Sequence, residues 1–165
     1  MPSTYEPIAT TTASGSTSSI TFSSISSAYT DLVLVSNASV TSGSDTVIIR
    51  FNGDTGSNYS RTFLSGNGSS TYSGRDTNAT WMNLSNQTDL NTTAGSWNAV
   101  ISIQNYANTT TNKTAIGRLN NAANGVNTAV GLWRSTAAIN SVTILTTGTN
   151  FSSSSTFTLY GIKAA

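Results

Sequence analysis

Two short stretches of the sequence have residue types that could do acid–base chemistry. Asp54-Thr55-Gly56 is the tripeptide that carries the catalytic carboxylate of aspartic proteases, and Ile116-Gly117-Arg118 resembles a second element of the retroviral type. That chemistry needs two carboxylates that share one proton inside apolar packing. Asp54 instead follows Asn52-Gly53, a strong hairpin-turn pair between two alternating runs. We therefore expect Asp54 at a solvated hairpin tip with an ordinary pKa and a local turn hydrogen bond, and no protease.

The same loop offers oxygen atoms that could hold a cation. Asn52, Asp54 and Asn58 could form a calcium site, but three mostly neutral ligands make a weak one, so a plain turn is the alternative. The chain has no His and no Cys, which excludes a Ser-His-Asp triad and imidazole or thiolate metal sites. The six acidic residues show no spacing that selects a glycosidase pair. We expect a protein that is not an enzyme, with no catalytic residue, no cofactor and no metal.

The composition indicates a neutral polar surface. Only 8% of the residues are charged and the net charge is +1, whereas 29 Thr, 28 Ser and 18 Asn make up much of the chain. Nucleic acids and anionic membranes require clustered Lys and Arg, so neither is expected as a partner. No run approaches the roughly 20 apolar residues of a membrane span, and the N-terminus does not have the basic start and apolar run of a secretory signal.

Apolar residues recur with a period of two, which predicts strands. The segment 97–104 places Trp97, Ala99, Ile101 and Ile103 on one face. The runs 47–51, 142–145 and 156–162 alternate in the same way, and 31–35 is apolar on both faces, as in a central strand or one covered by a neighbouring subunit. Further strands are expected at 5–11, 18–22, 59–65, 114–119 and 128–134. About ten short strands with polar turns and little or no helix predict one all-β domain over residues 1–165, an antiparallel β-sandwich of jelly-roll type.

The sequence allows two predictions for the structure of the N-terminal segment. Pro2 and Pro7 favour an extended arm over residues 1–12 that contacts a neighbour, whereas the alternation at 5–11 favours a first strand.

Aromatic side chains are the remaining specific features. Trp97 is expected in the core because it lies on an apolar strand face. Trp81 lies in a long polar region and is the better surface candidate, whereas Trp133 could be buried or exposed. As partner-contact residues we predict Tyr5, Pro7, Trp81, Trp133 and Arg134.

Several stretches together resemble a known group of proteins. They are "RFNGDTGSNYS" (50–60), "LWRSTAAINSVTI" (132–144), "STFTLYGIKAA" (155–165) and the segment 5–35. The chain resembles small virion structural proteins of tailed bacteriophages, including cyanobacterial and marine phages, which occur on capsids and on tails. The resemblance implies a β-sandwich assembly or adhesion module, usually a homotrimer, made in the host cytoplasm without a signal peptide and located in the virion.

Two functions follow from this resemblance as expectations. The first is a capsid decoration, or cement, protein that binds the major capsid protein or other virion proteins on the outer head surface and stabilises the shell. The alternative is a tail fibre or receptor-binding domain that recognises host surface glycans.

Overall fold

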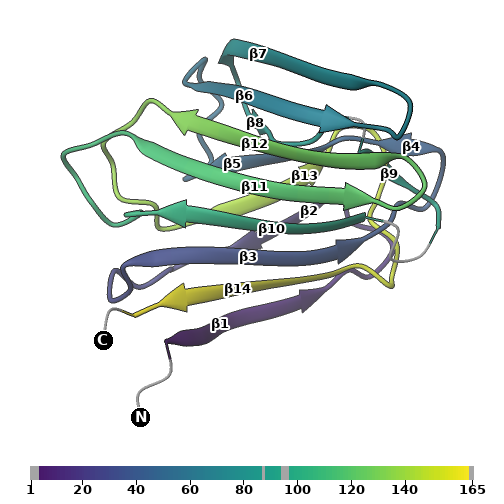
Figure 1. Ribbon diagram of the computed structural model, residues 1–165. Helices are drawn as coiled ribbons and strands as arrows, with labels where there is room; N and C mark the ends of the chain where they lie inside the picture. Colours follow the sequence, from purple (N-terminus) through teal and green to yellow (C-terminus); the bar gives the residue numbers. More distant parts are fainter. Residues whose placement is uncertain (1–3, 87, 94–96, 164–165) are drawn as a thin grey trace.

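The computed structural model describes residues 4–86, 88–93 and 97–163, and it consists of strands without a helix in that part of the chain. Two antiparallel sheets form the layers of a sandwich (Figure 1). The larger sheet has eight strands in the order β1-β14-β3-β10-β11-β12-β6-β7, and the smaller has four in the order β2-β13-β5-β8. A short third pair, β4 with β9, closes one end.

The strand bounds follow the alternating segments of the sequence. They are β1 Tyr5–Thr12, β2 Ser19–Phe22, β3 Asp31–Ala38, β4 Ser44–Asp45, β5 Val47–Phe51, β6 Tyr59–Gly66, β7 Thr71–Ala79, β8 Met82–Asn83, β9 Leu90–Asn91, β10 Trp97–Gln104, β11 Lys113–Asn121, β12 Gly125–Trp133, β13 Val142–Thr146 and β14 Thr156–Ile162. The predicted all-β sandwich is confirmed. The jelly-roll connectivity stays a prediction.

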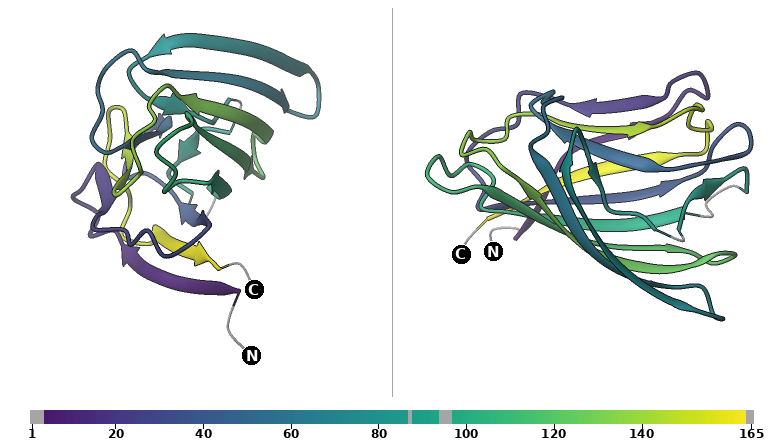
Figure 2. Two further views of the ribbon diagram at one scale, coloured as in Figure 1. Left: turned by 90° about the vertical axis from the view of Figure 1, so that its left-hand side faces the viewer. Right: turned by 90° about the horizontal axis from the view of Figure 1, so that it is seen from above.

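The core lies between the two sheets (Figure 2). β10 shows why the sequence folds this way: its odd-numbered residues from Trp97 to Ile103 are buried, and the even-numbered ones face out. The alternation of β13 and β14 places Val142, Ile144 and Phe157 in the same core. Burying such side chains is worth about 1.5–3 kcal/mol each, which explains why low overall hydrophobicity still gives a packed interior.

The eight-stranded sheet extends beyond the four-stranded one, and this positions the sites. β6 and β7 form a hairpin at one edge, and most of β7 is exposed (Figure 2). β1 is the strand at the opposite edge and pairs with β14, so residues 5–12 form a first strand. β3, the doubly apolar segment, lies inside the sheet between β14 and β10.

One local prediction is wrong. Asn52 and Gly53 do have the positive φ angles of a tight hairpin turn, 52° and 66°. The flanking strands β5 and β6 nevertheless belong to different sheets and do not pair. The turn therefore carries the chain from one layer of the sandwich to the other, because β5 pairs with β13 and β6 pairs with β12.

Candidate functional site

The Asp54 carboxylate holds its own loop together and ties it to the end of β12 at Trp133. Asp54 accepts hydrogen bonds from the Gly56 amide (2.7 Å), from Asn58 Nδ2 (2.9 Å) and from the indole nitrogen of Trp133 (2.6 Å). Burial alone would raise the pKa of Asp54, but the hydrogen bonds led by that of Trp133 outweigh it and lower the pKa. The local turn bond was predicted, but the expectation of a solvated tip with an ordinary pKa is wrong.

The same geometry argues against both chemical readings of the loop. Asn52 Oδ1 accepts from the amides of Asn140 and Ser141 at 2.9 and 3.2 Å, and both Asp54 oxygens face N–H donors, so these oxygens do not converge on a cation. Ile116 and Arg118 point out of the eight-stranded sheet on β11 and do not join Asp54. In the described ranges no cluster of three or more His, Cys, Asp or Glu could hold a metal ion.

The first surface of interest is the outer face of the eight-stranded sheet, the side turned to the viewer in Figure 1. Every other residue along β3, β10, β11, β12 and β6 projects there, and on β3 these include Val35 and Asn37. Between β3 and β6 the exposed large apolar residues on this face are Val35, Val100, Ile116, Val126, Val130 and Leu64, with Val126 and Leu64 exposed by 63% and 61%. We call this set the outer-face patch.

The sheet face that carries the patch is large and has one charge near its middle. The strands β3 to β6 at about 4.8 Å spacing, each about nine residues long, give this face an area on the order of 700 Å². The apolar side chains of the patch share it with polar ones such as Asn98, Asn120 and Thr128. Arg118 lies in the row between Val100 and Thr128, opposite both in the strand register. It lines three shallow hollows, of about 330, 570 and 400 Å³. No carboxylate in the described part of the chain pairs with Arg118.

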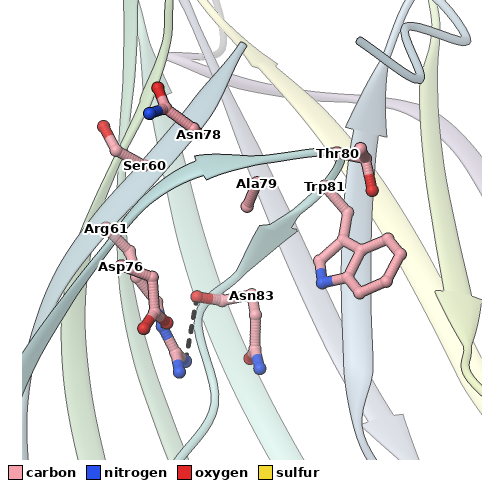
Figure 3. A pocket seen from close by; sticks show the side chains of 8 residues that line it. All are labelled: Ser60, Arg61, Asp76, Asn78, Ala79, Thr80, Trp81 and Asn83. Atoms are coloured by element: carbon pink, nitrogen blue, oxygen red, sulfur yellow. Dashed lines mark hydrogen bonds and ion pairs between the residues drawn. The ribbon is translucent and has the colours of Figure 1, made fainter. Parts of the chain in front are cut away.

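The second site is a cavity of about 350 Å³ beside the link from β7 to β8 (Figure 3). Its lining residues are Ser60, Arg61, Asp76, Asn78, Ala79, Thr80, Trp81 and Asn83. Trp81 is 37% exposed, whereas its neighbour Met82 is buried against β12, where a Cβ on Gly131 would lie 2.3 Å from the Met82 sulfur. The strand alternation at this point thus buries Met82 and turns Trp81 outward.

An irregularity in β7 shapes this cavity. The pairing of β6 with β7 shifts register between Tyr59 and Arg61, where one extra residue of β7 is inserted. Asn78 within that bulge has a left-handed φ of 57°. Bulges and strained non-glycine residues concentrate next to functional sites, because they redirect side chains away from the regular ladder.

The predicted contact residues fall in three different places. Tyr5 and Pro7 are exposed on the edge strand β1, and Trp81 is exposed beside the cavity. Trp133 is buried, 3% exposed, and packs against Phe51 and Tyr59 with ring centroids 5.7 and 6.4 Å away, so it is not available to a partner. Arg134 is half-buried and donates to the Ser57 carbonyl and to Asn78 Oδ1. These residues do not form one site, and the outer-face patch was not predicted as a contact surface.

Comparison with known proteins assigns no family. No protein-family model and no curated protein matches the chain. Among solved structures, an aerolysin-like protein from Bombina maxima aligns over 94% of this chain and 92% of that one, at 7% identity and a TM-score of 0.12. A likeness this low carries no argument about fold or function. In the described ranges, no helix is long and apolar enough to cross a membrane.

Proposed function

We propose that this chain is a structural protein of a bacteriophage virion, a capsid decoration protein that binds the outer surface of the head through its outer-face patch. The observation that carries the proposal is the exposure of this patch. Exposed apolar side chains that gather on one face, rimmed by polar residues, are typical of protein–protein interaction sites. A standard interface buries about 800 Å² on each partner, which is the size of this face.

The chemistry of the patch suits a permanent, passive contact. Its residues are Val, Ile and Leu side chains, which lose little side-chain entropy when covered. Arg118 requires an acceptor once water is excluded, because a buried unpaired charge is strongly unfavourable. We therefore expect the shell subunit to present a carboxylate opposite Arg118. A homotrimer would multiply modest contacts through effective concentration.

The decisive measurement is the copy number of this chain relative to the main shell protein in purified virions, by quantitative mass spectrometry. The proposal expects near-stoichiometric abundance. A much lower copy number would place the protein on a tail or a vertex, and absence from the particle would end the virion proposal.

A binding experiment tests the surface itself. Leu64→Asp and Val126→Asp place charges on the two most exposed patch residues and are expected to abolish binding to bare capsids while the fold is retained. Thr21→Asp on β2 is the matched control, since Thr21 is exposed on the outer side of the four-stranded sheet, away from the patch. Equal binding by all three variants would show that another surface contacts the shell.

A second candidate function is recognition of host glycans by a tail-associated domain. The exposed Trp81 beside a cavity with polar walls favours it, because small-ligand sites combine apolar or aromatic walls with a few placed polar groups.

A further inference from the structure

We propose that the cavity beside Trp81 binds an acidic saccharide, with the indole as a platform for the sugar ring. This inference deepens the second candidate function and rests on it, but not on the place of the protein in a virion. The cavity of about 350 Å³ is at the small end of ligand sites, which suits one sugar ring with its neighbours outside.

The polar groups of the cavity are held rigidly in place. The Arg61 guanidinium donates from Nε to Asp76 Oδ2 at 2.5 Å and from one terminal nitrogen to the carbonyls of Asn83 (3.2 Å) and Ser85 (2.5 Å). It also lies 4.6 Å from the ring centroid of Phe63. The Arg61 side chain is only 11% exposed, so a ligand would bind to it without first having to order it.

These anchored groups leave hydrogen-bonding capacity for a ligand. Asp76 is 53% exposed, and its second carboxylate oxygen accepts nothing from the described residues. The second terminal nitrogen of Arg61 and the Nδ2 of Asn83 likewise have no acceptor there. Such adjacent donors and acceptors match the neighbouring hydroxyls of a sugar.

The charge around the cavity favours an acidic ligand. Three arginines hold the 76–83 link: Arg61 as above, Arg50 through Nε to the Thr80 carbonyl (3.3 Å), and Arg134 to Asn78 Oδ1 (3.0 Å). The Arg50 guanidinium also lies 5.8 Å from the centroid of the Trp81 ring. Asp76 is the one carboxylate paired with them among the described residues. On a surface otherwise almost free of charge, this excess of cations marks the cavity as a site for a carboxylate-bearing sugar.

The experiment uses the purified whole chain and follows the three tryptophan indole N–H signals by nitrogen–proton correlation NMR. The probes are trigalacturonate and, as its neutral counterpart, a galactose trisaccharide, each up to about 10 mM, well above a Kd of ~1 mM. We expect trigalacturonate to shift the Trp81 signal and to leave those of the buried Trp97 and Trp133 unchanged. We expect the neutral sugar to bind at least about threefold more weakly, and added salt to reduce this preference.

Two pairs of variants test whether the residues at the cavity are responsible for sugar binding, which is measured by saturation transfer to the sugar. Trp81→Ala should weaken binding at least about tenfold, and Tyr5→Ala, an exposed aromatic on the far edge strand, should not. Arg50→Gln should reduce the preference for the acidic sugar, and Arg118→Gln, which removes the same charge elsewhere, should not. No shift of the Trp81 signal by either sugar, or binding that survives Trp81→Ala, would overturn the proposal. Equal affinity for both sugars would overturn its acidic specificity. None of these outcomes depends on virion abundance.

Discussion

Replacing Asp45 with Asn should destabilise the sandwich by a predictable amount. The Asp45 carboxylate, at 8% residue exposure, fastens β4 to the loop between β13 and β14. Its Oδ1 accepts from the amides of Thr46 (2.7 Å) and Thr147 (3.0 Å) and from the Thr147 hydroxyl. Its Oδ2 accepts from the amides of Gly148 (2.8 Å) and Thr149 (2.7 Å).

The magnitude follows from this donor set. An Asn side chain has one oxygen in place of two, so at least two backbone N–H groups face an NH₂ group instead of an acceptor. Each lost bond costs about 1–3 kcal/mol. Thr147 and Gly148 are exposed and can turn to water, so the lower end applies and the sum is about 2 kcal/mol. For a chain of this size that corresponds to a fall in Tm of about 4–8 °C.

The difference in the free energy of unfolding between the wild-type protein and Asp45→Asn should also depend on pH, which gives a second test. Burial, the largest single influence, would raise the pKa of Asp45, but the hydrogen bonds from Thr147, Thr149 and Gly148 together lower it below 3.8. A carboxyl with a lowered folded-state pKa contributes stability that is present above its unfolded pKa and is lost as the pH falls through the folded one. The difference in the free energy of unfolding between the wild type and Asp45→Asn should therefore be constant near neutral pH and shrink below about pH 4.

The assay is urea unfolding followed by tryptophan fluorescence, with Asp89→Asn as the matched control. Asp89→Asn removes the same charge, but among the described residues the Asp89 carboxylate accepts one hydrogen bond, from Thr46 Oγ1 at 3.1 Å, so this change should cost less than about 0.5 kcal/mol. If Asp45→Asn proved no more destabilising than Asp89→Asn, or if the difference in the free energy of unfolding persisted unchanged at pH 2, the Asp45 hydrogen bonds would not stabilise the fold as argued.

Two further predictions concern buried ionisable groups. Burial raises the pKa of Tyr59 to about 12, so the neutral phenol stabilises the fold fully below about pH 10, and this stabilisation is lost as the pH rises through 12. An absorbance titration should show one tyrosine that ionises near pH 12, together with a fall in Tm over the same range. Ionisation of Tyr59 near pH 10 would contradict this prediction. Lys113 is 1% exposed, donates to the carbonyls of Thr111 (2.7 Å) and Thr136 (3.2 Å), and burial lowers its pKa. Because no carboxylate compensates this ammonium in the described part of the chain, Lys113→Met should raise the free energy of unfolding by about 1 kcal/mol, and a loss of stability would show that its two carbonyl bonds outweigh the burial cost.

The parts of the fold that could be predicted are those where the two faces of a strand differ. β10 is the clearest case, since Trp97 and Ile101 alternate with Asn98 and Ser102, and the structure buries the first pair. β7 could not be predicted, because the segment 71–79 has no apolar alternation. It is exposed along most of its length and is held by its backbone pairing with β6.

The surfaces were harder to predict because the apolar residues on some strands face outward. On β11 the buried face carries Ala115 and Gly117, whereas the exposed face carries Ile116 and Arg118. In most strands the larger apolar residues face the core, but on β11 the small residues face it and a large aliphatic one faces solvent. The period of two therefore predicts a strand here without showing which of its faces packs against the core. Trp81 was placed on the surface from its polar neighbours, but the arginines that surround it come from three separate strands or their ends, and only the tertiary structure brings them together.

The two proposed surfaces are compatible with one another because of the alternation of β6. Thr62 and Leu64 project to the outer face, whereas Arg61 and Phe63, which contact each other, lie on the opposite side of the hairpin. A protein that docks its outer-face patch on a shell therefore keeps the Trp81 cavity open to solvent. We expect particles decorated with the wild-type chain to bind trigalacturonate, and particles decorated with the same number of Trp81→Ala chains not to bind it. Loss of sugar binding whenever the wild-type chain is on the shell would mean that the cavity, and not the outer face, is the side that docks.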